Sequence, residues 1–355
     1  MASTRLRLVG VFLTGAILAV AVAGAGAKGS ARTDFLQSFS VAGSIDAQPS
    51  TALRTSRLAR VAERGGPITA TTGEVVHVFV SDLLPAETPE KWAEIIAGLT
   101  HGAELSRLTS HIATLEEVQD LCGERALGCY SRNELVALGE TTVEGTTPEE
   151  VIRHEYGHHI AYHRLNAPWR AIDWGPKNWA SAATVCPRVA RSEAFPGNEG
   201  RNYSQNPGEA WAEVYRLMDE RKAGITTPTW PIIVASFFPD ETALRAAEVD
   251  VVQPWTVNRI SKHTRTFGRN TPRVWWIPVQ TPLDGDLALT ATLPKGGLHE
   301  VALVSANRST VLRRAQWVGQ RAKRLTTSVC GQRSSFVRIT QGGALGRVAL
   351  TVSKP

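Results

Sequence analysis

One short run of the chain has the spacing of a metal site only if its backbone is helical. Its sequence is His154-Glu155-Tyr156-Gly157-His158-His159. In an α-helix, residues four apart lie one turn above each other, so His154 and His158 can direct two imidazoles at one metal ion, at about 2.0–2.1 Å. Glu155 lies about 100° further round the helix, where it can reach a metal-bound water. The run therefore predicts a helix that presents a metal site.

The residues around this run support a helix. Thr147-Pro148-Glu149-Glu150 has the form of a capping box with proline in the first turn. The helix should stop near Asn166, because Pro168 cannot continue it. Gly157 costs about 1 kcal/mol in mid-helix relative to alanine, which indicates close packing beneath the site.

A second capped helix comes later in the chain. Asn206 can cap it, Pro207 opens it, and Ala210 to Arg221 continue it. The segment between the two helices, Ala167 to Ser204, is long, aromatic and contains Gly and Pro, so we expect a loop over a site.

Two histidines leave a catalytic zinc ion one protein ligand short, since such sites use three and keep a fourth position for water. The metzincin pattern would need Gly at position 161 and His at 164, but Ala161 and Arg164 stand there. The second helix instead contains Glu209-Ala210-Trp211-Ala212-Glu213.

With these two helices the chain resembles the gluzincins, the thermolysin-like and bacterial collagenase-like zinc metallopeptidases. The resemblance covers about a tenth of the chain. It implies that Glu209 is the third zinc ligand and that Glu213 orients a ligating histidine. It also suggests Tyr203 as a donor to the reaction's oxyanion, although a packing role is the preferred interpretation of this residue. Because 51 residues separate His158 from Glu209, Glu213 stays a rival third ligand, and Glu193 and Glu199 are weaker candidates.

His159 and His163 also stand four apart, on a neighbouring face of the first helix. A second metal is one interpretation of this pair. No acid accompanies them, so ordinary packing or surface roles are the preferred interpretation.

The first residues, 1–27, have the form of a signal peptide, with Arg5 and Arg7 before an apolar run and small residues that allow cleavage after Ala25 or Ala27. A retained membrane anchor is the alternative. Residues 28–70 are rich in Ser, Ala, Arg and Gly and suggest a mature tail or a short pro-segment. We expect a secreted protein, extracellular or associated with the cell wall.

Residues 71–262 are expected to form an α+β, zincin-like metallopeptidase domain, with a small sheet, the active-site helix and a mostly helical lower part. Strands are predicted at Val75–Val80 and Glu134–Glu140. A helix is predicted to begin at Thr88-Pro89 and to bury Trp92 with later residues at helical spacing.

Residues 265–355 change character to short apolar runs separated by turn signals such as Asp284-Gly285. The runs are Val274–Ile277, Leu287–Leu293, Val301–Val304, Phe336–Ile339 and Val348–Val352. This pattern predicts an all-β sandwich or jelly roll. It resembles the bacterial pre-peptidase C-terminal β-sandwich, a non-catalytic accessory module.

The four cysteines of an exported chain predict two disulfides rather than thiolate metal ligands. Cys122 and Cys129 bracket a short loop and are expected to pair locally. Cys186 and Cys330 then pair by elimination.

Charge divides at the same boundary. From Arg265 to Pro355 there are fourteen Lys and Arg and three acids, a net charge of +11, whereas the whole chain is +6 and the remainder therefore −5. This is compatible with an anionic cell-wall polymer as a partner of the basic domain, and a solvated basic face is an equal alternative. No nucleic-acid partner is expected, and we expect a monomer.

The sequence thus predicts a secreted zinc endopeptidase. Zinc, held by His154, His158 and Glu209, would activate a water for attack on a peptide carbonyl, with Glu155 as general base. One alternative is an exported wall-binding protein with an inactive metallopeptidase-like domain. Another is a hydrolase of cell-wall peptide cross-links, in which only the substrate differs.

Overall fold

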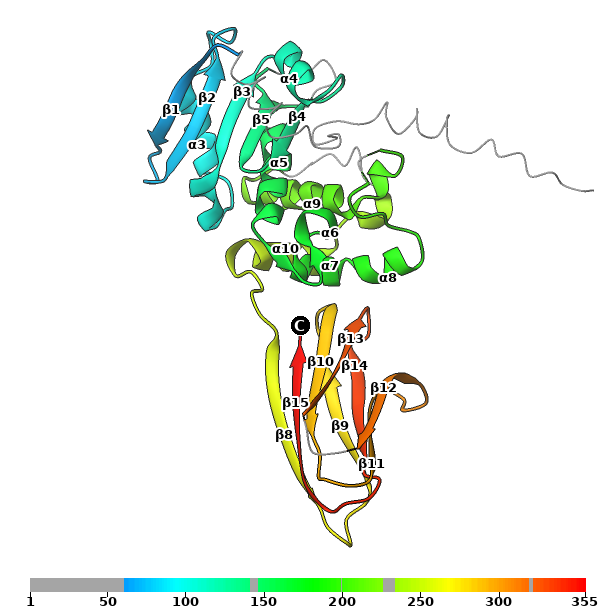
Figure 1. Ribbon diagram of the computed structural model, residues 1–355. Coiled ribbons are helices and arrows are strands. Elements are labelled where there is room, and N and C mark those ends of the chain that lie inside the picture. The colour runs from blue at the N-terminus through cyan, green and yellow to red at the C-terminus, as the bar shows by residue number, and fades with distance from the viewer. Residues whose placement is uncertain (1–60, 141–145, 199, 226–233, 319–321) are drawn as a thin grey trace, which may run out of the picture.

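The computed structural model describes residues 61–140, 146–198, 200–225, 234–318 and 322–355, which form an α+β body followed by an all-β body (Figure 1). The α+β class is as expected. The expected signal peptide and residues 28–60 of the expected tail lie outside the described residues. In the part that is described, no helix combines the length and apolarity needed to cross a bilayer.

A five-stranded mixed sheet, in the order β1-β2-β3-β5-β4, forms one half of the first body. The strands are β1 Glu63–Thr69, β2 Val75–Ser81, β3 Thr109–Ala113, β4 Gly128–Ser131 and β5 Glu134–Leu138. The three central strands are parallel, and the two edge strands β1 and β4 run antiparallel to their neighbours. The predicted strands at 75–80 and 134–140 are confirmed.

Strand β1 corrects the extent of the expected tail, because residues 63–69 pair along their whole length with β2. Their sequence, with two consecutive glycines and a proline, has no strand periodicity of its own. The pairing with β2, rather than local preference, makes this segment a strand.

Helices form the rest of the first body. They are α3 Pro89–Ala97, α4 Leu115–Cys122, α5 Pro148–Tyr162, α6 Ala171–Trp174, α7 Lys177–Ala182, α8 Val185–Ala190, α9 Pro207–Lys222 and α10 Glu241–Val252, with 3-10 turns at Ala103–Arg107, Tyr203–Gln205 and Ala235–Phe237. The three predicted caps are confirmed: Thr88, Thr147 and Asn206 each accept a backbone N–H through the side chain.

Two expectations about this region are wrong in detail. Helix α5 ends at Tyr162, four residues before Asn166, because Leu165–Asn166 (β6) turn back to pair with Trp169–Arg170 (β7). The segment 167–204 is not a plain loop, since it contains α6, α7 and α8. Helices of four to six residues are too short to show a helical periodicity in the sequence.

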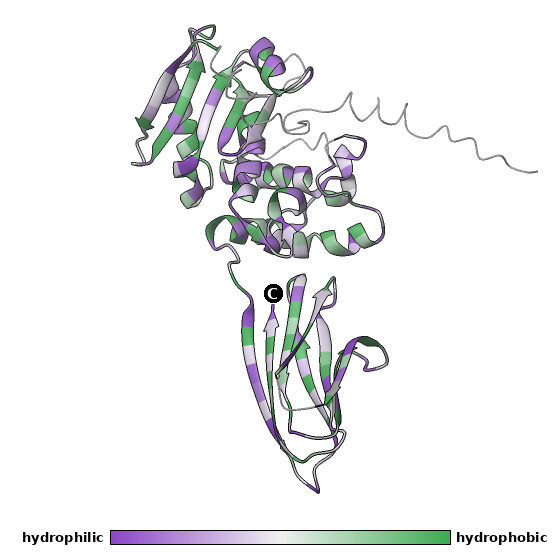
Figure 2. Ribbon diagram, in the orientation of Figure 1, coloured by the Kyte–Doolittle hydropathy of each residue, from purple (hydrophilic) through white to green (hydrophobic). Residues whose placement is uncertain are grey.

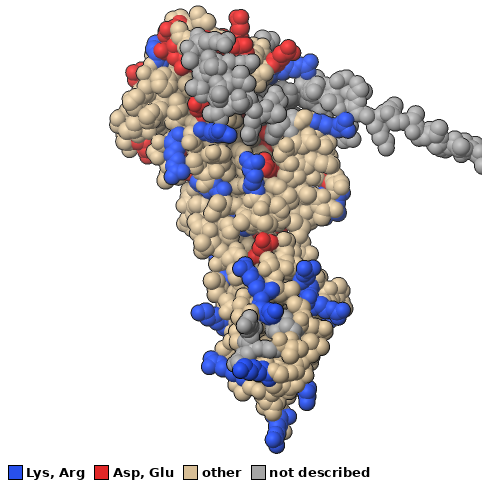
Figure 3. Space-filling view, in the orientation of Figure 1, with Lys and Arg blue, Asp and Glu red and all other residues tan. Residues whose placement is uncertain are grey.

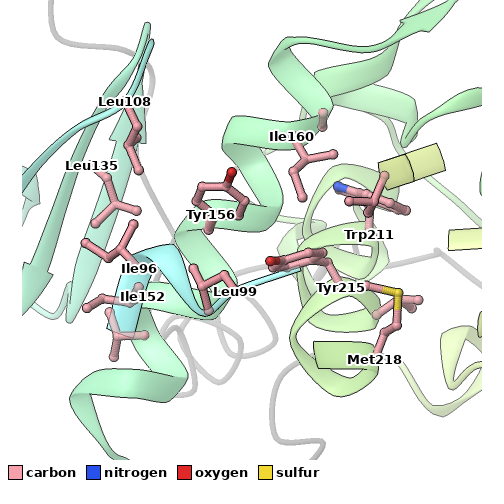
Figure 4. Packing of buried hydrophobic residues seen from close by; sticks show 14 of the residues in the cluster. Ile96, Leu99, Leu108, Leu135, Ile152, Tyr156, Ile160, Trp211, Tyr215 and Met218 are labelled. Atoms are coloured by element: carbon pink, nitrogen blue, oxygen red, sulfur yellow. The ribbon is translucent and has the colours of Figure 1, made fainter. Parts of the chain in front are cut away.

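The core of the first body lies between the sheet and the helices, where α5 contributes Ile152, Tyr156 and Ile160 and α9 contributes Trp211 and Tyr215 (Figure 4). All five of these side chains are fully buried. Because α5 packs on the sheet through one face and on α9 through another, nearly every position from Val151 to Ala161 is buried. The core therefore fixes the helix that presents the histidines.

The second body is a sandwich of two four-stranded antiparallel sheets, in the orders β13-β10-β15-β8 and β12-β11-β14-β9. The strands are β8 Arg259–Phe267, β9 Val274–Gln280, β10 Gly285–Thr292, β11 Leu298–Ser305, β12 Val311–Val318, β13 Lys323–Val329, β14 Ser334–Thr340 and β15 Gly346–Lys354. Both sheets supply alternate residues to one apolar core, and this alternation is visible along the strands in Figure 2.

The five apolar runs predicted as strands are all strands, but β8, β12 and β13 were not predicted. These three are edge strands; β8 and β13 are rich in Lys, Arg, Thr and Ser, and β12 has two adjacent arginines, Arg313 and Arg314, near its centre. Since β8 begins at Arg259, the sandwich starts before residue 265.

Both predicted disulfides are present, Cys122–Cys129 and Cys186–Cys330. The second joins α8 of the first body to the turn after β13 of the second. Beside it, the buried Lys177 ammonium donates to the carbonyl of Asp284, 2.7 Å away. Arg333 donates to the carbonyl of Ser181, at 3.0 Å. The two bodies are thus joined by a covalent bond and by buried polar contacts.

Candidate metal centre

The site lies where α5 and α9 pack together, and a glycine makes the close approach possible. A Cβ atom at Gly157 would lie 2.8 Å from Cα of Ala212 on α9, closer than real Cβ contacts. The indole Nε1 of Trp211 also donates to the carbonyl of Gly157, at 2.7 Å. The expected close packing at Gly157 is therefore present, and it sets the distance between the two helices.

Three ligand-type atoms meet across this contact. The Nε2 atoms of His154 and His158 lie 3.2 Å apart, and Oε2 of Glu209 lies 3.3 Å from the first and 3.5 Å from the second. Three ligands at about 2.05 Å around a tetrahedral ion would lie about 3.3 Å from one another. The side chains are all buried. This buried triangle could hold a metal ion.

Glu213 lies on the other side of the His154 ring. Its Oε1 is 2.7 Å from Nδ1 of His154, while its Oε2 accepts from Arg216 at 2.7 Å. Arg216 also donates to Glu220, at 2.7 Å. Glu213 therefore contacts the His154 ring from the side opposite Glu209 and does not join the triangle. A carboxylate behind a ligating imidazole fixes its tautomer and raises its basicity.

The charged groups of the site shift one another's pKa values. Burial alone would lower the pKa of His154, but hydrogen bonds to Glu209 and Glu213 outweigh it and raise this pKa to about 10. Burial likewise opposes the ionisation of Glu209, but the two histidines hold its pKa well below the ordinary range. The carboxylates thus favour a positive charge at the triangle, whether a proton or a metal cation supplies it.

Tyr203 contacts the triangle directly. Its hydroxyl donates to Oε2 of Glu209 at 2.6 Å, and its side chain is buried. This is the oxygen that faces both histidines. The structure therefore places Tyr203 at a candidate ligand, where it can hold the carboxylate in position.

Glu155 is completely buried on α5, beside edge strand β4. A Cβ atom at Gly128 of β4 would lie 2.9 Å from Oε1 of Glu155, so the carboxylate lies against the strand backbone. Its charge is one of the influences that raise the pKa of His154. Glu155 is thus near the triangle without being part of it.

The remaining candidates lie elsewhere. His159 contacts the Tyr130 hydroxyl (3.1 Å) and the Glu104 carbonyl (2.9 Å), and burial lowers its pKa to about 4. His163 contacts Asn133 at 2.6 Å. These contacts agree with the packing interpretation, and within the described residues the triangle is the only group of this kind.

Glu193 is exposed and pairs with Arg191, so it is not a third ligand here, and Glu199 lies outside the described residues. Arg216 was not predicted from the sequence, although its spacing of three from Glu213 and four from Glu220 on one helix was an available signal.

Comparisons with known proteins do not assign the chain to a family. No family model matches it, and no curated protein matches it. Among solved structures, the mitogen from Yersinia pseudotuberculosis is 10% identical and covers 28% of this chain and 88% of its own, with a TM-score of 0.22. PirA is 11% identical and covers 26% and 92%, with a TM-score of 0.20.

The capsular polysaccharide assembling protein CapF from Staphylococcus aureus is 10% identical and covers 49% of each chain, with a TM-score of 0.18. Likenesses with TM-scores this low support no argument about fold or function. Only the residues of the chain itself can therefore indicate a function.

Proposed function

We propose that the chain is a secreted zinc endopeptidase of the gluzincin type, with a zincin-like first domain. The observation on which this rests is the buried triangle of His154 Nε2, His158 Nε2 and Glu209 Oε2. Two imidazoles and one carboxylate form a common ligand set of catalytic zinc, with a fourth position open to water.

Zinc bound there would polarise a substrate carbonyl and lower the pKa of a coordinated water to about 7. Glu155 is the proposed general base, which takes a proton from the attacking water and passes it to the leaving amine. Glu213 and Arg216 keep the His154 ring in the ligating tautomer. The 2.6 Å hydrogen bond from Tyr203 to Glu209 supports a positioning role for this tyrosine.

A peptide is the substrate that best suits the surroundings of Glu155. Among the strands that the structure describes, β4 is the last of its sheet, and its residue Gly128 lies next to the Glu155 carboxylate. An extended peptide can pair with such an edge and so place a peptide bond at the site. The two disulfides favour an oxidising, extracellular location.

The two alternatives keep the same geometry. An inactive, wall-binding protein would retain the ligands without turnover. A hydrolase of cell-wall peptide cross-links would cleave those peptides rather than proteins.

Hydrolysis of casein and of a peptide library tests the proposal, with wild type, Glu155→Gln and Glu149→Gln compared with and without a chelator. Glu149 stands in the first turn of the same helix and controls for the loss of one carboxylate. We expect chelator-sensitive cleavage by wild type and by Glu149→Gln. Glu155→Gln should keep its zinc and lose about 10²–10⁴-fold in rate. Full hydrolysis by Glu155→Gln would rule out its role as the base, and an inert wild type would favour the wall-binding alternative.

A further inference from the structure

The outer face of the sheet β12-β11-β14-β9 has a feature that the proposed peptidase does not use. Along β9 and β14 the inward residues enter the core, and Trp276, Phe336 and Arg338 project from the opposite face. The Trp276 and Phe336 rings pack edge to face, with centroids 6.2 Å apart. Two aromatic rings thus stand on the outer face of this sheet.

Arg308 lies over both rings. It comes from the loop between β11 and β12, where its backbone has a φ of +62°. Its guanidinium carbon is 4.2 Å from the Phe336 centroid and 5.0 Å from the Trp276 centroid. Cation–π contacts of this kind help to hold the guanidinium in place, and because Arg308 is exposed its N–H groups stay available.

Two further arginines extend this surface. Arg338 lies 5.7 Å from the Trp276 centroid and donates to Glu300 at 2.7 Å. Arg314 is exposed on β12 and stands in the same cross-strand row, because Ala302 of β11 pairs with both Arg338 and Arg314. Since neighbouring strands are about 4.8 Å apart, the backbones of these two arginines lie about 10 Å from each other.

Positive charges far outnumber negative charges in the all-β domain that carries this surface. The domain's three acids are each already engaged: Asp284 with Arg333, Asp286 with Ser328, and Glu300 with Arg338. Figure 3 shows Lys and Arg spread over the visible face of the all-β body, with very few acidic side chains. A cationic surface with several arginines complements a chain of repeated anions.

We propose that Arg308, which lies over Trp276 and Phe336, binds a linear anionic polysaccharide together with Arg338 of β14 and Arg314 of β12. Planar guanidinium groups bind carboxylates in a bidentate manner, and repeated acidic sugars would meet successive arginines along the row. Single-stranded nucleic acid fits less well, because base stacking requires open aromatic faces, whereas these two rings pack edge to face with Arg308 close to both. This binding is independent of the proposed peptidase activity.

Binding of the full chain to polygalacturonate at low salt tests the proposal, by isothermal titration calorimetry, with dextran as the neutral control. The test variant changes Arg308, Arg314 and Arg338 together to Gln. The matched control changes Lys262, Arg324 and Arg347 to Gln, which removes three charges from the strands of the other sheet.

We expect the test variant to bind at least about tenfold more weakly and the control to change less than about twofold. Equal losses in both variants would show attraction by net charge alone and would overturn the proposal. Tighter binding of a single-stranded oligonucleotide than of polygalacturonate would overturn the choice of ligand. If the triple variant does not fold, the exposed pair Arg308→Gln and Arg314→Gln gives the same comparison against Lys262→Gln and Arg324→Gln.

Discussion

Replacing Gly157 by alanine should weaken metal binding although it touches no ligand. The added Cβ would lie 2.8 Å from Cα, 3.1 Å from the carbonyl oxygen and 3.3 Å from Cβ of Ala212. Carbon atoms pack at about 3.5 Å or more, so α9 must recede by about 0.7 Å. Because Glu209 lies on α9 and both histidines lie on α5, this shift opens the ligand triangle.

Two opposing effects set the magnitude. Alanine is favoured over glycine in a helix by about 1 kcal/mol, whereas overpacking costs about 1–3 kcal/mol. We therefore expect the Gly157→Ala protein to be destabilised by about 0–2 kcal/mol. Metal sites tolerate errors of about 0.2 Å in ligand distance. A displacement of about 0.7 Å should therefore weaken zinc binding by about 10–100-fold, comparable to the loss of an outer-shell partner.

Urea unfolding of the metal-free protein and chelator competition for zinc measure the two effects separately. Gly200→Ala is the control, because a Cβ there meets nothing within 4 Å. Adding Ala212→Gly to Gly157→Ala should restore only part of the affinity, since the nearest atom of Ala212 is its Cα. If Gly157→Ala were about 1 kcal/mol more stable than wild type with unchanged zinc affinity, the packing argument would be refuted.

Three further predictions concern the site and the joint between the bodies. The metal must displace a proton from His154, whose pKa is raised to about 10, so the zinc affinity should rise about tenfold per pH unit from pH 7 to 9. Chelator competition measures this affinity, and a zinc affinity that stays constant above about pH 7 would contradict the prediction. Arg216→Met removes the arginine partner of the buried Glu213 carboxylate and should lower the free energy of unfolding in urea by about 3–5 kcal/mol. A loss below about 1 kcal/mol would be inconsistent with a buried ion pair. The Cys186–Cys330 bridge spans 144 residues, so changing both cysteines to Ser should cost up to about 5 kcal/mol; an unchanged melting temperature would show that the polar contacts alone hold the joint.

The elements that the sequence predicted well are specified by neighbouring residues. The box of Thr147 and Glu150 closes within one turn, so the start of α5 could be predicted at residue resolution. Strand β1 could not be predicted, because its own sequence lacks strand periodicity and the strand forms by pairing with β2. The edge strands β12 and β13 could not be predicted for a related reason: the described side chains of β12 are nearly all exposed, and in β13 only Leu325 and Val329 are buried among polar residues.

Some residues of the site could likewise be predicted from local spacing, and others could not. The spacing of His154, Glu155 and His158 is local and predicts two ligands and a base. The third ligand depends on how α9 crosses α5, which the pattern of residues around Gly157 only hinted at. The hydrogen bond of Tyr203 to Glu209 joins a 3-10 turn to a helix side chain, and no spacing rule predicts it.

The most direct test is the zinc content per chain of the wild type, Glu209→Ala and Glu213→Ala after dialysis, measured by mass spectrometry of the metals. We predict one zinc per wild-type chain, almost none in Glu209→Ala, and reduced but measurable zinc in Glu213→Ala, because that carboxylate only orients His154. Full zinc in Glu209→Ala, or iron in place of zinc in the wild type, would contradict the proposed metal centre.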